Sequence, residues 1–208
     1  MSATLANMSR RAGEPAAVTS FGQHAEESLL FIRRTMERSS TFTAAPGLGG
    51  VGMGAIGLVA AVLAANQISP ERWIVVWLLA AAVALGIGVT TMWRKAVRLG
   101  VPLAGAVGRR FAMSLAAPLV AGAALTLGVW MNGDWVLMPA VWLLLYGTGL
   151  LAGGAFSVAA VRLLGVAFMA LGVAALVTPP AWGNVWLGMG FGGLQLVFGL
   201  YIASRHGG

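Results

Sequence analysis

The stretch GLGGVGMGAIGLVAAVLAA, residues 47–65, carries no charged side chain. An α-helix rises about 1.5 Å per residue, so a run of this length crosses the roughly 30 Å hydrocarbon core of a bilayer. Five later runs share this character: Trp73–Met92, Phe111–Trp130, Trp135–Leu151, Val158–Val177 and Val185–Ser204. The sequence therefore predicts six transmembrane helices.

The composition of the whole chain agrees with a membrane protein. Hydrophobic residues make up 59% of it and charged residues 9%, whereas a soluble domain has about 25% charged residues. Mean hydropathy is +0.86. Most connections between the runs are short, which makes consecutive helices antiparallel neighbours. We therefore expect residues 46–208 to form an all-α, polytopic integral membrane domain with its six helices in a compact bundle.

The basic residues indicate the orientation. Twelve of the thirteen Lys and Arg residues fall on one side of the predicted membrane, and only Arg72 falls on the other. Cytoplasmic segments carry this excess, so both termini are expected in the cytoplasm. Six tryptophans near the outer ends of the runs are expected to form an interfacial belt: Trp73, Trp77, Trp130, Trp135, Trp182 and Trp186. The basic side fits the lipid bilayer as partner rather than nucleic acid, because no groove interleaved with aromatic residues accompanies it.

Residues 1–45 form a separate cytoplasmic segment that precedes the first run. Within it, Ala25, Leu29, Ile32 and Met36 repeat at steps of four, three and four. This spacing predicts an amphipathic helix over about 22–40. The helix either lies on the inner leaflet or against the bundle, or it docks a protein partner.

The phrase FIRRTMERSSTFTAAPG, residues 31–47, runs into the glycine-rich first span. The chain resembles an uncharacterised group of bacterial six-span membrane proteins over its whole length. The resemblance implies the plasma (inner) membrane of a bacterium as the location. It implies no activity, ligand or catalytic residue.

Small residues recur at helical spacing in three of the six runs. Helices in a membrane associate by close van der Waals contact, which small residues permit. We therefore expect packing seams, within the bundle or partly in a homo-oligomer, at Gly50, Gly54, Gly57, Gly149, Gly153, Gly188, Gly192 and Gly199.

Four residues are candidates for polar contacts near the midplane: Gln195, Tyr146, Trp142 and Thr126. An amide within the hydrocarbon region needs a partner. Gln195 shares the spacing of Gly188, Gly192 and Gly199, so it is expected on the same helix face. It either bonds a neighbouring helix, at Tyr146 or Thr126, or it contacts a ligand.

Residues for recognised chemistry are missing from the predicted spans. None of them contains Asp, Glu, Lys or His, and the chain has no cysteine. This excludes thiolate chemistry and disulfides, and it leaves no set of residues for a metal, a cofactor or acid–base catalysis. We therefore expect a non-enzymatic membrane protein: a subunit, scaffold or regulator acting through its cytoplasmic helix and basic loop. The alternative is a small transporter or channel for a neutral or hydrophobic solute.

Overall fold

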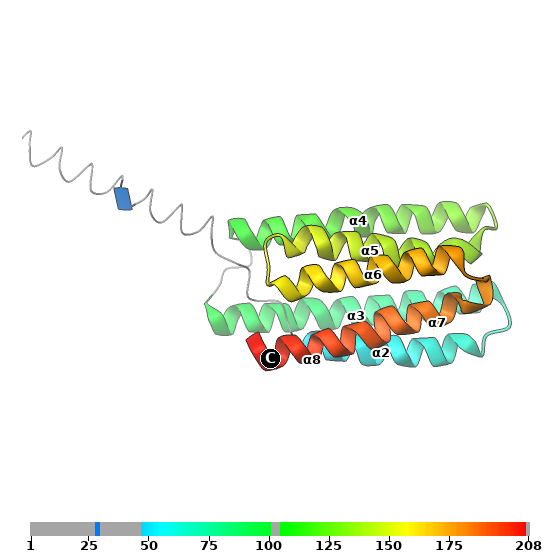
Figure 1. Cartoon of the computed structure of the whole chain (residues 1–208), viewed down its shortest axis with the longest axis horizontal. Helices are drawn as coiled ribbons and strands as arrows, with labels where there is room; N and C mark the ends of the chain where they lie inside the picture. The colour runs from blue at the N-terminus through cyan, green and yellow to red at the C-terminus, as the bar shows by residue number, and fades with distance from the viewer. Residues whose placement is uncertain (1–27, 30–46, 101–104, 207–208) are drawn as a thin grey trace, which may run out of the picture. The chain divides into compact units, whose positions relative to one another are not determined.

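The computed structural model describes residues 28–29, 47–100 and 105–206 (Figure 1). The chain divides into a unit of Met1–Ser40 and a unit of Thr41–Gly208. The amphipathic helix expected over 22–40 lies outside the described residues, apart from Ser28 and Leu29. Within the described part of the second unit, all regular structure is helical, and six helices are long and apolar enough to cross a membrane. The prediction of six apolar helices is confirmed to this extent.

Each expected span overlaps one of these helices. The first five are α2 (Gly47–Ala65), α3 (Pro70–Leu99), α4 (Ala106–Met131), α5 (Met138–Gly154, preceded by the 3₁₀ turn η1, Trp135–Leu137) and α6 (Ala159–Val177). The last is built from four consecutive pieces: η2 (Pro180–Trp182), α7 (Gly183–Leu187), η3 (Gly188–Leu194) and α8 (Gln195–His206).

The ends of α3 follow from local sequence. Ser69 caps its start by accepting a hydrogen bond from the Arg72 backbone N–H at 3.4 Å, and Pro70 occupies the first turn. Its end comes at Gly100, whose φ of 63° is a left-handed conformation that glycine adopts without strain. No breaker precedes Gly100, so the helix continues through residues that the sequence assigned to a basic loop. The arginines of that loop therefore stand on the ends of α3 and α4.

The helices of the second unit form two groups of three. In one group α2 packs along α3 and α8, and in the other α5 packs along α4 and α6. Figure 1 shows α4, α5 and α6 together, with α2, α3 and α8 beside them. The two pieces α7 and η3 contact helices of both groups. The last span therefore joins the two groups.

The middle of the last span departs from the regular α-helix that the sequence predicts. Gly188–Leu194 is a π-helix, in which backbone N–H groups bond the carbonyl five residues back. At its end the Gln195 N–H reaches the carbonyl of Gly190. Each turn of a π-helix holds more residues than an α-helical turn, so residues before and after it are rotated relative to the α-helical pattern.

Candidate functional site

Gln195 is buried and paired. Its side chain is 4% exposed, and its Nε2 donates to the hydroxyl of Tyr146 on α5 at 2.5 Å. Tyr146 is one of the two partners that the sequence suggested. The bond joins the last span to the other group of three helices.

Trp142 and Thr126 form a second polar pair. The indole Nε1 of Trp142 donates to the hydroxyl of Thr126 at 2.8 Å, and that hydroxyl donates to the Gly122 carbonyl at 2.7 Å. This pair joins α5 to α4. The four candidate polar residues thus meet as two separate pairs, with Trp142 and Tyr146 one turn apart on α5.

Aromatic rings surround Tyr146. Its ring centroid lies 4.9 Å from that of Phe168 on α6 and 5.1 Å from that of Phe191 on η3, and the last two are 5.2 Å apart. We call Tyr146, Phe168 and Phe191 the aromatic triad. Phe168 is fully buried. Tilted and edge-on ring contacts of this kind stabilise by about 0.5–1.5 kcal/mol beyond the area they bury.

Tryptophans extend these contacts between the helix groups. Trp77 on α3 lies 6.3 Å from Phe191, centroid to centroid. Trp73 stacks on Trp142 of α5 at 5.7 Å with an interplanar angle of 7°. Large side chains therefore make the junction between α3 and α5.

Asn184 on α7 is a hydrogen-bonding hub that the sequence reasoning missed. Its Oδ1 accepts from the indole nitrogens of Trp77 at 3.1 Å and Trp73 at 3.3 Å. Its Nδ2 donates to the Ala61 carbonyl on α2 at 2.8 Å. One amide thus links the first, second and last spans. The signal in the sequence was a Trp pair four residues apart on one span, with an amide near the start of the last span.

The prediction of an interfacial belt is wrong for Trp77. Trp77 is 4% exposed, and Trp73 is half-buried against Trp142 and Asn184. Their N–H groups find a partner inside the protein rather than at a lipid headgroup. Trp182, at 52% exposed, remains at the surface.

The glycines of α2 lie against the backbone of the last span. A Cβ at Gly50 would stand 3.0 Å from the Cα of Gly199, and one at Gly54 would stand 2.7 Å from the N of Leu196. At Gly57 it would overlap the Phe191 carbonyl oxygen. Seen from the other side, Gly188, Gly192 and Gly199 meet Ala61, Leu58 and Val51 respectively. No side chain larger than hydrogen fits these α2 positions without moving the backbone.

The glycines of the last span and the side chain of Gln195 contact different helices. Gly188, Gly192 and Gly199 contact α2, whereas the Gln195 side chain bonds Tyr146 on α5. Gly199, one α-helical turn after Gln195, still contacts α2, and the Gln195 carbonyl oxygen lies 3.6 Å from a Cβ built at Gly50. The Gln195 side chain therefore reaches α5 from a position beside the glycine seam.

Gly149 and Gly153 contact side chains of α4. A Cβ at Gly149 would stand 3.1 Å from Leu115 Cδ1, and one at Gly153 would stand 3.3 Å from the ring of Phe111. At both glycines the nearest atoms of α4 belong to large side chains, and a backbone carbonyl oxygen follows at 3.6 Å.

A closer seam joins α5 to α6 and was not predicted. A Cβ at Gly165 would stand 2.6 Å from the N of Leu151, and one at Gly147 would stand 2.8 Å from the Gly165 carbonyl oxygen. Gly172 likewise faces Leu144. The seven-residue spacing of Gly165 and Gly172 keeps both on one side of α6. That spacing was the signal in the sequence.

The buried polar side chains of the described part are hydrogen-bonded. No fully buried side-chain nitrogen or oxygen there lacks a hydrogen-bond partner, and no group of three or more His, Cys, Asp or Glu residues gathers there. These polar side chains join helices by hydrogen bonds, through Gln195–Tyr146, Trp142–Thr126 and Asn184.

No protein-family model matches the chain, and neither a curated protein nor a solved structure matches it. The candidate function therefore rests on the residues and their geometry.

Proposed function

We propose that the chain is a non-enzymatic integral membrane protein, a subunit, scaffold or regulator acting through its N-terminal amphipathic helix and its basic α3–α4 connection. One observation carries the proposal: the polar side chains between the helices bond one another. Gln195 is 4% exposed and bonded to Tyr146, and Asn184 makes hydrogen bonds to Trp73, Trp77 and Ala61. Side-chain amides that bond neighbouring helices hold those helices together and leave little polar surface for a solute.

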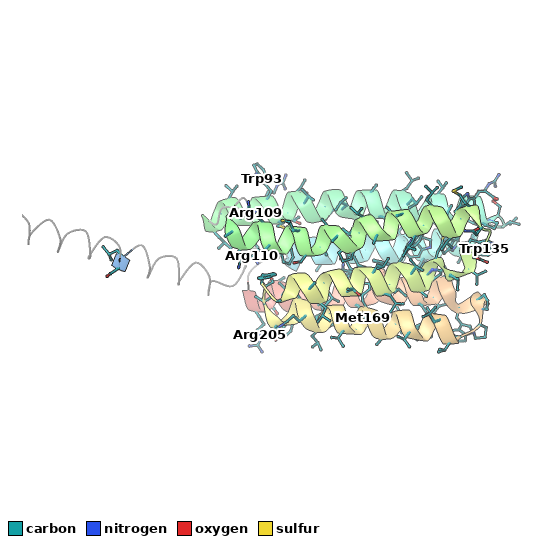
Figure 2. All side chains as sticks on the ribbon, turned by 90° about the horizontal axis from the view of Figure 1, so that it is seen from above. Trp93, Arg109, Arg110, Trp135, Met169 and Arg205 are labelled. Carbon is teal, nitrogen blue, oxygen red and sulfur yellow. The ribbon has the colours of Figure 1, made fainter. Side chains whose placement is uncertain are left out.

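We further propose a compact six-helix bundle in a bacterial plasma membrane, with both termini in the cytoplasm. The basic residues support this orientation. Figure 2 shows Arg109, Arg110 and Arg205 at one end of the helices and Trp135 at the other. We call the first of these the basic end. The start of α2 lies at the same end as the last turn of α8, because Gly47 contacts Ala203. Positive residues collect on the cytoplasmic side.

One experiment addresses the partner. The full chain is cross-linked in cells and purified in mild detergent. The variant Leu29→Glu/Ile32→Glu, which interrupts the expected apolar stripe, is treated in the same way. The matched control is Glu27→Gln/Glu37→Gln, which changes charge off that stripe. We expect a stoichiometric partner protein that the control retains and the stripe variant loses. A chain that purifies alone, or a partner retained equally by all three, contradicts the proposal.

A small transporter for a neutral or hydrophobic solute is the second candidate. The observation that favours it is the π-helix beside the aromatic triad, since such segments occur frequently at functional sites. In this candidate function the two helix groups rock about the junction at which Trp73 stacks on Trp142 and Trp77 contacts Phe191. Solute flux into proteoliposomes that is lost in Gln195→Leu, while the protein stays folded, would favour this candidate over the first.

A further inference from the structure

The two longest helices, α3 and α4, are the least covered by the rest of the chain. In the most apolar 18-residue window of each, 6% of α3 and 0% of α4 is buried, against 33–44% in the other spans. Large apolar side chains point outward on both, including Val83 and Val89 on α3 and Met113 and Val120 on α4. These faces have no partner among the described helices.

Four exposed arginines stand at the basic end of the same two helices. Arg94 and Arg98 lie one turn apart near the end of α3, and Arg109 and Arg110 lie near the start of α4. Residues 100–105 connect the helices, so the chain holds their ends within about 25 Å of each other. Figure 2 shows Trp93, Arg109 and Arg110 at this end. Trp93 is 58% exposed, as a ring at headgroup level is.

No described carboxylate neutralises these four arginines. In residues 47–100 and 105–206 the acids are Glu71, in the first turn of α3, and Asp134, just after α4. Both stand at the end opposite the arginines. The first turn of α4 carries no acid, and the positive end of its helix dipole adds to the charge of Arg109 and Arg110. The surface therefore favours an anion.

We infer that α3 and α4 bind an anionic phospholipid with two phosphate groups, of the diphosphatidylglycerol class. Arg94 with Arg98 takes one phosphate, and Arg109 with Arg110 takes the other. Guanidinium groups bind phosphate oxygens by charge-assisted, often bidentate hydrogen bonds. The acyl chains cover the outward apolar faces of the two helices. Two phosphates on one molecule give a second contact at high effective concentration, which a single-phosphate lipid lacks.

The test uses the full chain in detergent, washed free of lipid. Thermal unfolding is followed as diphosphatidylglycerol, phosphatidylglycerol or phosphatidylcholine is added at equal phosphate. We expect the diphosphate lipid to raise the Tm at the lowest concentration and phosphatidylcholine to leave it unchanged. Equal effects of the first two lipids overturn the two-phosphate site, and equal effects of all three overturn any anion site.

Charge-matched variants locate the site. Arg109→Gln/Arg110→Gln should raise the half-saturating concentration of the diphosphate lipid about tenfold, because two charge-assisted contacts are lost. The control is Arg162→Gln/Arg205→Gln, which removes two positive charges from α6 and α8 at the same end. This control should leave the half-saturating concentration of the diphosphate lipid unchanged. Equal weakening in both variants means a general surface charge and overturns the inference. Native mass spectrometry of the unmodified protein gives a second readout: a retained diphosphate lipid supports the site, and only single-phosphate lipids count against it.

Discussion

Two amides at the junction of the helix groups have different surroundings. Gln195 donates one hydrogen bond to Tyr146, whereas Asn184 serves two indole N–H groups and one carbonyl. In an apolar medium an unbonded donor costs more than its bond contributes when made. The loss of stability on each substitution should therefore depend more on how many N–H or O–H donors are left without an acceptor than on the bond that is removed.

Gln195→Leu should lower stability modestly, because it removes the amide and its bond at similar volume. Interhelical bonds in membranes average about 0.6 kcal/mol, with a maximum near 1.7 kcal/mol. A double-mutant cycle with Tyr146→Phe, measured by unfolding in detergent, should give a coupling energy in that range. Additive losses would mean that the two side chains do not interact.

Asn184→Leu should cost more, about 1–3 kcal/mol, because the indole N–H groups of Trp73 and Trp77 lose their acceptor. The change also alters the surroundings of both rings, so tryptophan fluorescence should shift. Asn132→Leu is the control, since the exposed side chain of Asn132, just after α4, donates to the Gly128 carbonyl one turn earlier rather than to another helix. Equal losses in the two variants would contradict a hub role.

At the scale of the helix, two seams bring backbones together. In the α2 seam the last span lies directly on Gly50, Gly54 and Gly57, and in the α5–α6 seam Gly147 faces Gly165. Membrane helices gain little from burying apolar side chains against one another, so backbone approach supplies the contact instead. Side-chain size at these glycines therefore decides whether the helices associate.

Gly57→Ala should destabilise strongly, because the added methyl would overlap the Phe191 carbonyl. Gly86→Ala and Gly128→Ala are the controls, as a Cβ there meets nothing within 4 Å. The controls should be neutral or slightly stabilising, since alanine favours the helix. Thermal unfolding in detergent measures all three, and similar changes at the three sites would refute the seam.

The sequence predicted the spans well because length and lack of charge are properties of each segment alone. The range 47–65 matches α2 at both ends. Partner choice was harder: the sequence left Tyr146 and Thr126 open as partners of Gln195, and the bond is made to Tyr146. Trp77 was expected in an interfacial belt because its position near a span end says nothing about Asn184, which is distant in sequence. Contacts between distant spans depend on how the helices are arranged, and no single run encodes that.

At the scale of the whole molecule, the charges at the two ends of the helices differ. The basic end carries Arg109, Arg110 and Arg205 (Figure 2), whereas Glu71 and Asp134 stand at the other. A bilayer distinguishes these ends through the positive-inside bias. Orientation is therefore measurable without knowledge of the function.

The chain has no cysteine, so single-cysteine labelling is clean. In intact cells, Asn132→Cys should react with an impermeant maleimide, because Asn132 follows the end of α4 opposite the basic end, which the proposed orientation places outside. Ala106→Cys, at the start of α4, should react only after permeabilisation. The opposite result would reverse the proposed orientation.

The seam between α2 and the last span also has a consequence for synthesis. Of the six described spans, the ribosome makes the one with α2 before the other five and the one with α8 after them, so the glycine face of α2 lacks its α8 partner until the other four have entered the membrane. Helices α4, α5 and α6 follow one another and can associate as they emerge, whereas closing α2 onto α8 is a contact of large sequence separation and comes late. In a chain interrupted after α6, that glycine face would stay uncovered by the last span, so unfinished copies would differ from complete ones at this surface.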